Sequence, residues 1–525
     1  MNLVSLLDEA AQRTPDAAAI IDGRLGAEHI TSFADLCGHS AQIATLFAQA
    51  GIGRGDGVVI LIPMSAELYA VIAAALRLGA VPVFIDPEQA AAQLERCRGV
   101  LPLKALVGTP KACLFRWLQP TLRTIKTVFV AQGWFPGAIS LEHAGSLPPI
   151  AHAESGLEDE PAMLTFTSGS TGAPKGLLRS HRLLLETQQI LIRHLALRPG
   201  NINLATMPAL VMANLAHGVT SLIPEGDLRH PAALDPAHIA SVIRHWKAES
   251  LLASPALVER LAEHCLSGHQ TLDSLQVIFM GGAPVFLPVM QKAAQIAPQA
   301  RVAALYGSTE AEPIALIHLD EICETDRRAI AQGAGLPAGQ PLQEIGLAIL
   351  QDRWGQPLGP FSETDMATLV LPAGKIGEVV VSGPHVSQGY LGGLGDMETK
   401  FRIGNKIWHR TGDSGWLDEA GRLWLTGRCS ARLGEGEQTL YPLSVEAALA
   451  NDPDIARAAF VSHRGKRLLV LELKQGVEPG PLEKTLSWAG IDRIVILSRI
   501  PVDRRHNAKT DYPALRRELD LLAGP

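Results

Sequence analysis

Short apolar runs alternate with helical patterns through the first half of the chain, and this alternation constrains the fold more than any other feature. Val58–Ile62 precedes a helical pattern over Ala66–Leu78, and Val81–Ile85 precedes a second over Gln89–Cys97. Apolar runs without polar alternation are typical of strands buried on both faces, and intervening helices let such strands run parallel. The pattern predicts βαβ units in a mostly parallel sheet.

A second α/β unit is expected further along the chain. A helical pattern covers about His181–Leu195, and apolar runs near Leu222–Ile223 and Ser250–Ala253 predict two more strands. Residues 110–155 carry no pattern that we can assign beyond a connecting region.

The pattern changes after residue 340. Short strands separated by Gly, Pro and Asp are predicted at Ile345–Leu350, Gly377–Ser382 and Arg422–Thr426, which indicates an antiparallel or barrel-like part. A mixed pattern then begins, with strands near 458–461 and 467–473 and helices near 444–450 and 482–489. We place a domain boundary close to Gly427.

Composition limits the class of protein. A chain of 525 residues exceeds what one hydrophobic core usually supports, so two or more domains are expected. Hydrophobic residues make up 47% and charged residues 19%, which is typical of a globular enzyme. The formal net charge of -7 argues against a nucleic-acid partner, because long phosphate backbones attract basic surfaces.

The cysteines and the apolar segments bear on location. The six cysteines include no C-x-x-C pair, so we expect neither a zinc site nor a disulfide framework, and a cytoplasmic location fits. The N-terminus lacks the basic and long apolar regions of a signal peptide. The most apolar segment, 68–85, is interrupted by Arg77, Gly79 and Pro82, so no integral membrane segment is expected.

Residues 165–176 read Thr-Phe-Thr-Ser-Gly-Ser-Thr-Gly-Ala-Pro-Lys-Gly, directly after an apolar run. Glycines let successive backbone amides turn inward, hydroxyl groups add donors, and Lys175 adds a positive charge. The spacing differs from that of a Walker P-loop. This segment predicts a loop that binds a polyphosphate.

Four more clusters have the composition of ligand contacts. Glycines follow an apolar strand at 279–284, and an aromatic residue precedes a carboxylate at 306–310. Asp413 could accept ribose hydroxyls or could be a turn residue, and Lys509 could act at a reacting centre or be a solvated surface charge. Tyr306 and Glu310 likewise could be a core tyrosine and a solvated glutamate.

In their order along the chain, these clusters resemble the adenylate-forming superfamily, which includes acyl-CoA synthetases, peptide-synthetase adenylation domains and firefly luciferase. The resemblance covers nearly the whole chain. It implies an α/β fold, with a large N-terminal domain (1–427) of two α/β subdomains plus a distorted β-barrel. It further implies a hinge at 428–431 and a small mobile α+β domain at 432–525, with ATP and Mg²⁺ as cofactors.

The resemblance also implies residue roles. ATP or AMP would contact Thr167, Ser168, Gly169, Ser170, Thr171, Gly172, Lys175, Gly281, Gly282, Ala283, Pro284, Tyr306, Gly307, Ser308, Asp413 and Arg428. Lys509, Thr309 and Glu310 would be catalytic, and Glu310 and Thr167 would hold the metal. Cations and N–H donors suit this chemistry, because attack of a carboxylate on the α-phosphorus brings two anions together.

The acyl group would bind where the family begins its acyl pocket. The segment 207–218 contains no Lys, Arg, Asp or Glu, so an apolar acyl chain is favoured over an amino acid. Ala209, Leu210, Val211 and Met212 are the predicted contacts. A plain core helix is the alternative interpretation.

Three segments are more specific, namely 78–87, 218–224 and 501–509. They resemble the β-lactone synthetases of bacterial olefin biosynthesis, which activate a 2-alkyl-3-hydroxy fatty acid and close a β-lactone. An intramolecular hydroxyl needs no thiol acceptor, since its effective concentration is already high. After Arg428 the sequence Cys-Ser-Ala-Arg-Leu-Gly-Glu-Gly-Glu departs from the hinge and Gly-Gly loop of CoA ligases.

Two alternatives stay open at this stage. The first is a ligase that forms a thioester with CoA or an acyl-carrier protein, so CoA, a carrier protein or another pathway enzyme are candidate partners besides the acyl carboxylate. The second is a non-catalytic protein that binds acyl groups or nucleotides.

Overall fold

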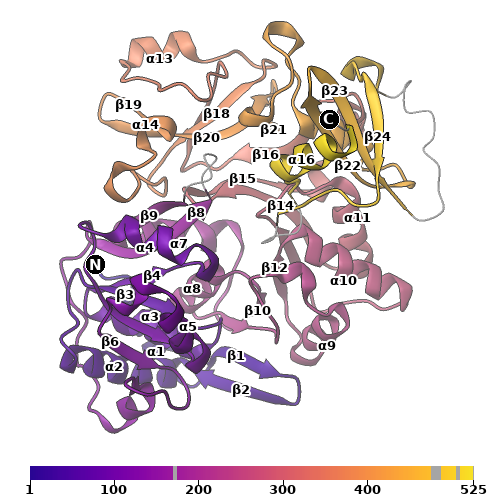
Figure 1. Cartoon of the computed structure of the whole chain (residues 1–525). Coiled ribbons are helices and arrows are strands. Elements are labelled where there is room, and N and C mark those ends of the chain that lie inside the picture. Colours follow the sequence, from indigo (N-terminus) through magenta and orange to yellow (C-terminus); the bar gives the residue numbers. More distant parts are fainter. Residues whose placement is uncertain (169–173, 475–485, 504–508, 524–525) are drawn as a thin grey trace. The chain divides into compact units, whose positions relative to one another are not determined.

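The computed structural model describes residues 1–168, 174–474, 486–503 and 509–523. The chain divides into two compact units (Figure 1). Unit 1 comprises Met1–Leu228, His245–Leu251 and Pro384–Met397, and unit 2 comprises Arg229–Arg244, Leu252–Gly383 and Glu398–Pro525. The elements α9 (Pro236–Trp246), β12 (Ser250–Ala253) and α14 (Asp396–Thr399) lie where the chain passes from one unit to the other.

Unit 1 contains a seven-stranded sheet, which is parallel except for its last pair. Its order is β7 (Ile139–Ser140), β6 (Thr127–Val130), β5 (Leu103–Gly108), β3 (Gly57–Leu61), β4 (Val81–Phe84), β8 (Pro161–Ser168) and β9 (Pro174–Ser180). A second set of strands has the order β2 (Ala27–Ser32), β1 (Ala18–Arg24), β11 (Thr220–Leu222) and β10 (Ile202–Ala205). The prediction of an α/β fold with parallel βαβ units is confirmed.

The helices of unit 1 follow from local sequence signals. In α3 (Ala66–Arg77), Ser65 caps the first turn by accepting from the Leu68 N–H, and Gly79 leaves the helix with φ +64°. Its residues from Leu68 to Arg77 are all buried, which explains the apolar segment seen in the sequence. The other helices are α1 (Ser5–Arg13), α2 (Phe33–Gln49), α4 (Ala90–Cys97), α5 (Pro110–Leu118), α6 (Pro120–Arg123), α7 (His181–His194) and α8 (Pro208–His217).

Residues 110–155 are more regular than a connecting region. They form α5, α6, β6 and β7, with Cys113, Leu122, Ile125 and Val128 buried in the same core as Val59 and Leu106. Thr109 caps α5, and Pro110 occupies its first turn. This segment was missed because its helices and strands are too short to show a clear periodicity.

Unit 2 contains strands in the order β13 (Val277–Met280), β14 (Arg301–Ser308), β15 (Ala311–His318), β16 (Leu336–Pro341), β21 (Leu423–Arg428), β20 (Lys406–Leu417), β18 (Gly377–Ser382) and β17 (Gly346–Leu350), and β19 (Lys400–Ile403) pairs with β20. Only β13 and β14 are parallel in this series. The antiparallel arrangement predicted for 340–427 is confirmed. Its helices before residue 400 are α10 (Pro255–Ser267), α11 (Leu287–Ile296), α12 (Glu324–Ala331) and α13 (Glu363–Leu369).

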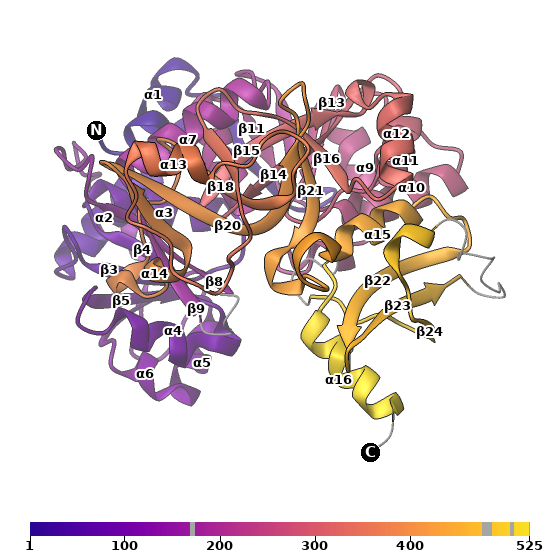
Figure 2. The same cartoon turned by 90° about the horizontal axis from the view of Figure 1, so that it is seen from above.

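The last part of unit 2 has its own small sheet. The strands β22 (Ile455–His463), β23 (Lys466–Leu473) and β24 (Arg493–Leu497) lie between α15 (Pro442–Leu449) and α16 (Tyr512–Ala523) in two hydrophobic clusters (Figure 2). The helix expected over 482–489 is not seen in the described residues 486–489, which form a 3₁₀ turn at Ser487–Ala489. Residues 482–485 lie outside the described part.

One buried ion pair joins β18 to β20. The guanidinium of Arg410 binds Glu378 at Nε–Oε1 and Nη2–Oε2 distances of 3.0 and 2.6 Å, and both side chains are fully buried. Arg410 also donates to the carbonyl oxygens of Gln356 (2.5 Å) and Glu398 (3.3 Å). Each charge is therefore compensated inside the protein.

We expect Glu378→Gln to destabilise the protein by about 3–5 kcal/mol, because it leaves the buried Arg410 guanidinium without its counter-charge. Thermal unfolding followed by calorimetry measures the effect. The control is Glu324→Gln, which breaks an exposed pair with Arg328 and should leave the unfolding midpoint unchanged. Equal midpoints for Glu378→Gln and the native protein would contradict this assignment.

Candidate functional site

The predicted nucleoside contacts of unit 2 lie at the ends of two parallel strands. Met280 of β13 pairs with Ala304 of β14, so Gly281 and Tyr306 follow at the same edge of the sheet. A Cβ at Gly281 would lie 3.2 Å from the Leu305 carbonyl oxygen, and Gly282 has φ +82°. Glycine is thus needed for close strand approach and for the turn. Gly282 is exposed, and Ala283 and Pro284 are half-buried.

Tyr306 and Asp413 are in direct contact, although 107 residues separate them. The Tyr306 hydroxyl donates to Asp413 Oδ2 at 2.8 Å, and Arg428 Nε lies 3.1 Å from Asp413 Oδ1. Burial, followed by the charge of Asp413, raises the pKa of Tyr306 well above its usual value, so the phenol remains a donor. The carboxylate of Asp413 raises the pKa of Arg428.

Asp413 lies within β20, so the alternative interpretation as a simple turn residue is wrong. It pairs with Arg428 across β20 and β21, and its N–H donates to Thr411 Oγ1 at 3.0 Å. The Asp413 side chain is 17% exposed and that of Arg428 is 50% exposed. Each carboxylate oxygen of Asp413 accepts one hydrogen bond, Oδ2 from Tyr306 and Oδ1 from Arg428. Because a carboxylate oxygen can accept two hydrogen bonds, Asp413 can still accept from two hydroxyl groups.

The remaining residues of this cluster lie on the β14–β15 hairpin. Thr309 and Glu310 are at its tip, Gly307 and Ser308 are at the end of β14, and Ser308 pairs with Ala311. The Ser308 Oγ atom is buried without a hydrogen-bond partner among the described residues. Glu310 is close enough to Arg428 to contribute to its raised pKa. An orphaned hydroxyl and a carboxylate beside Asp413 fit a polar ligand.

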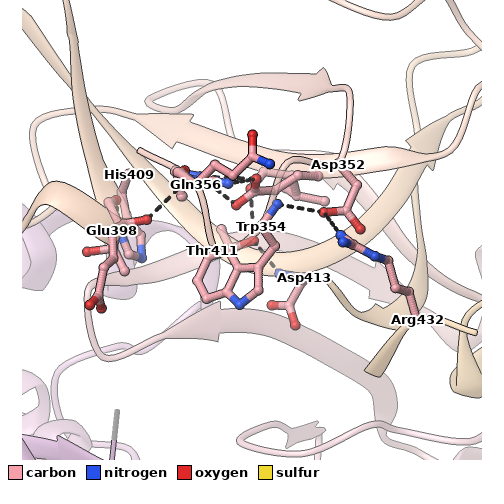
Figure 3. Close-up of polar contacts among 12 residues, drawn as sticks. Asp352, Trp354, Gln356, Glu398, His409, Thr411, Asp413 and Arg432 are labelled. Carbon is pink, nitrogen blue, oxygen red and sulfur yellow. Dashed lines mark hydrogen bonds and ion pairs between the residues drawn. The ribbon is translucent and has the colours of Figure 1, made fainter. Parts of the chain in front are cut away.

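Two residues that support Asp413, Trp354 and Glu378, were missed by sequence reasoning. Gly412 has φ +69°, and a Cβ there would lie 2.8 Å from the Trp354 ring, so the indole packs directly on the backbone before Asp413. The Arg410 guanidinium lies 5.2 Å from the same ring and binds Glu378. Figure 3 shows Trp354 close to Thr411 and Asp413. Trp354 and Glu378 stand outside every recognised motif, so no sequence signal could have found them.

The predicted phosphate contacts of unit 1 lie on the β8–β9 hairpin. Thr167 pairs with Lys175 across the two strands. Lys175 is only 7% exposed, and its Nζ lies 5.5 Å from the centre of the Tyr390 ring. A Cβ at Gly395 would lie 2.7 Å from Lys175 Cε, so the lysine stem packs on this glycine. Tyr390 and Gly395 were not predicted from the sequence.

The tip of this hairpin cannot be compared with the prediction. Gly169, Ser170, Thr171 and Gly172 lie outside the described residues, and Ser168 is described only as the last residue of β8. Their phosphate-binding role stays a prediction.

The predicted acyl contacts lie on α8 of unit 1. Leu210 and Val211 are buried, Met212 is half-buried and Ala209 is exposed. On the same helix, Asn214 donates to Asn203 Oδ1 (3.2 Å) and to Ser221 Oγ (3.0 Å), and all three side chains are buried. A buried polar network therefore includes this helix, although the segment has no charged residue, and acyl binding by α8 stays a prediction.

Lys509 lies on a hairpin of unit 2. Its N–H binds Asp503 Oδ1, its carbonyl accepts from the Asp503 N–H, both at 2.8 Å, and Val502 and Thr510 form a β-bridge. The Asp511 N–H donates to the Pro501 carbonyl at 3.0 Å. Residues 501–503 and 509–511 are thus held together beside the lysine.

The predicted hinge residues are followed by a carboxylate contact. Residues 429–431 form a 3₁₀ turn, after which Arg432 Nη1 binds Asp352 Oδ1 at 3.0 Å (Figure 3). The Tyr441 hydroxyl donates to Asp352 Oδ2 at 2.8 Å. Asp352 also accepts from the Trp354 N–H at 2.9 Å, so this carboxylate links the segment after residue 431 to Trp354, which packs on the backbone beside Asp413.

The family model of the AMP-binding enzymes matches residues 7–391. The chain belongs to the AMP-binding enzyme family. This family member is 32% identical to the olefin β-lactone synthetase of Stenotrophomonas maltophilia (strain K279a), over 97% of this chain and 96% of that protein. It is 30% identical to the olefin β-lactone synthetase of Xanthomonas campestris pv. campestris, over 97% of this chain and 95% of that protein.

Solved structures agree with the family. O-succinylbenzoate coenzyme A synthetase of Bacillus subtilis, in complex with ATP and a magnesium ion, superposes with a TM-score of 0.73 at 21% identity, over 98% of both chains. The protein is an adenylate-forming, acyl-activating enzyme with the fold of that group.

Two further observations concern membranes and metals. Within residues 1–168, 174–474, 486–503 and 509–523, no helix is both long and apolar enough to cross a bilayer. Over the same ranges, no group of three or more His, Cys, Asp and Glu side chains is arranged to hold a metal ion. Mg²⁺ needs no such group, because it commonly takes one or two carboxylates together with substrate phosphates and water.

A titrating contact holds the Lys509 hairpin to α15. Tyr512 follows this hairpin directly, and its hydroxyl donates to Oε1 of Glu446 on α15. Burial raises the pKa of Glu446 to about 7, against the opposing effects of Tyr512, the Phe460 backbone and Arg457. The folded protein therefore binds the Glu446 proton more tightly than the unfolded chain does.

We expect this glutamate to make stability decrease as pH rises from about 4.5 to about 7, because the unfolded chain gives up the proton first. Glu446→Gln stays neutral, so its unfolding midpoint should rise relative to the native protein between pH 5 and pH 8. The exposed control Glu419→Gln should show no such trend. A difference between Glu446→Gln and the native protein that is the same at both pH values would contradict the raised pKa.

Proposed function

We propose that this enzyme uses ATP and Mg²⁺ to adenylate a 3-hydroxy fatty acid and then closes a β-lactone from the acyl adenylate. The observation that carries the proposal is the similarity to two olefin β-lactone synthetases along 97% of the chain. The arrangement of Tyr306, Asp413 and Arg428 supports nucleotide binding in unit 2.

Different residues bind the nucleoside and the phosphates of ATP. Asp413 accepts the ribose hydroxyls, Tyr306 and the segment 281–284 bind the adenine, and Arg428 neutralises Asp413. The β8–β9 hairpin, with Thr167 and Lys175, binds the phosphates. Glu310 and Thr167 are the residues that would hold Mg²⁺ together with phosphate oxygens, and the bound ion would offset negative charge on the phosphates.

The first step joins the substrate to the nucleotide. A carboxylate oxygen attacks the α-phosphorus, and the bond from this phosphorus to the pyrophosphate oxygen breaks, so that pyrophosphate leaves with the electron pair. Lys509 places its ammonium group between the carboxylate and the α-phosphate, where negative charge gathers in the transition state. The contacts to Asp503 hold the backbone of Lys509 for this task.

The second step is intramolecular. The 3-hydroxyl oxygen attacks the acyl carbon, the bond from this carbon to the AMP oxygen breaks, and the hydroxyl proton passes to solvent. No thiol takes part. The segment 432–525 acts as a mobile domain that turns about 428–431 between the steps, and Asp352, which binds Arg432 and Tyr441, holds one of its positions.

A thioester ligase is the second candidate. It is favoured by the structural likeness to a coenzyme A synthetase, and it shares the adenylation step. The two functions differ only in which nucleophile attacks the acyl adenylate.

We expect Lys509→Ala to slow adenylation by about 10²–10³-fold, because it removes the cation placed at the reacting phosphorus. ATP affinity should change little, since other residues bind the nucleotide. Carboxylate-dependent exchange of labelled pyrophosphate into ATP measures the first quantity, and calorimetric titration measures the second. Lys466→Ala, an exposed lysine on β23, is the matched control. Undiminished exchange in Lys509→Ala would remove this lysine from the mechanism.

We expect a 2-alkyl-3-hydroxy fatty acid, ATP and Mg²⁺ to yield a β-lactone, AMP and pyrophosphate in equal amounts without CoA. Mass spectrometry of the extracted product detects the loss of one water from the acid. The matched acid without a 3-hydroxyl should support pyrophosphate exchange but give no lactone. A thioester formed only in the presence of CoA would instead establish the ligase, and no exchange with any acid would contradict adenylation.

A further inference from the structure

One segment of unit 1 has a charge opposite to that of the whole protein. Residues 96–141 contain seven basic side chains and no Asp or Glu, in a chain with a net charge of -7. The seven are Arg96, Arg98, Lys104, Lys111, Arg116, Arg123 and Lys126. Arg98 pairs with Glu95 at 3.2 Å, whereas no carboxylate lies within 4.0 Å of Lys111, Arg123 or Lys126 in the described part of the chain. These three side chains are exposed.

The same segment exposes large apolar side chains. On α5, Leu114, Trp117 and Leu118 are 51%, 47% and 73% exposed, and Trp134 in the loop after β6 is 75% exposed. Spacings of three and four residues place Lys111, Leu114 and Trp117/Leu118 on one face of α5, opposite the buried Cys113. Exposure of two tryptophans and two leucines to water does not stabilise a folded monomer.

The loop that contains Trp134 lies beside α5, because the rings of Trp117 and Phe135 lie 5.3 Å apart. We call the exposed residues Lys111, Leu114, Trp117, Leu118, Arg123, Lys126 and Trp134 the α5 patch. Arg123 Nε donates to the Trp117 carbonyl at 2.8 Å, so a cation is held at the edge of the apolar area (α5 and α6, Figure 2).

We propose that the α5 patch docks the enzyme on the surface of a membrane that contains anionic phospholipids. Tryptophan favours the boundary between headgroups and acyl chains, and leucine side chains enter the apolar layer beside it. Lysine and arginine around them bind anionic headgroups, each adding to the affinity. The surplus of basic over acidic groups complements such a surface, and Glu142, which accepts from the Gly133 N–H at 3.4 Å, is an acidic residue beside the Trp134 loop. The protein lies on the bilayer and does not cross it.

Vesicle binding tests this proposal. Full-length protein is sedimented with vesicles of phosphatidylcholine alone or with about one third phosphatidylglycerol. We expect binding only to the anionic vesicles, weakening as salt is raised, because salt screens the charges. Brominated lipids should quench tryptophan fluorescence in the native protein and much less in Trp134→Ala, since bromine quenches rings that enter the acyl boundary.

Variants locate the surface. Lys111→Glu with Lys126→Glu, and separately Leu118→Ala with Trp134→Ala, should each lower the vesicle partition coefficient about tenfold or more. The matched controls are Lys375→Glu with Lys406→Glu, and Leu521→Ala, which change exposed residues elsewhere and should bind like the native protein. Circular dichroism and pyrophosphate exchange with a water-soluble acid verify folding. These positions have no role in the reaction, so the test is independent of the proposed function.

Three outcomes would overturn the proposal. The first is equal binding to neutral and anionic vesicles, or no binding to either. The second is unchanged binding in both sets of patch variants. The third is a change of mass in sedimentation velocity, in which the native protein is a dimer and the patch variants are monomers, because a second copy would then cover the patch.

Discussion

The buried ion pair between Glu378 and Arg410 supports the position of Asp413. A guanidinium and a carboxylate without solvent are stable only when their hydrogen bonds are satisfied, and here the Gln356 and Glu398 carbonyls complete the set. The pair joins β18 to β20, and Trp354 packs on both Arg410 and Gly412. Asp413 follows Gly412 directly, so its position depends on the buried Glu378–Arg410 ion pair, which is not itself among the predicted ligand contacts.

The candidate site uses strands as rigid supports and hairpins as contact elements. Tyr306, Asp413 and Arg428 come from three strands and meet through two charged or polar contacts. Lys175 and Lys509 lie on hairpins, and each is held by neighbours that take no part in the chemistry. Such an arrangement orients donors before substrate arrives, which reduces the reorganisation needed in the transition state.

An enzyme that activates long acyl chains binds one substrate that dissolves in water, the nucleotide, and one that does not, the acyl chain. Membrane docking through the α5 patch would bring the protein to the phase in which such chains collect. The net negative charge of the chain conceals this property, because residues 96–141 contain seven basic residues and no Asp or Glu, while all 53 acidic residues lie in the rest of the chain.

The sequence by itself determined the α/β class, the parallel βαβ order, the approximate limits of the helices expected at 66–78, 89–97, 181–195 and 444–450, and the motifs, because these depend on periodicity, capping and short-range chemistry. Only the tertiary structure decided that Tyr306 binds Asp413, that Glu378 and Trp354 support it, and that Tyr390 covers Lys175. It also decided which residues of 110–155 are exposed. Contacts between residues far apart in the chain depend on how the helices and strands pack, and a local sequence pattern does not indicate which residues will meet.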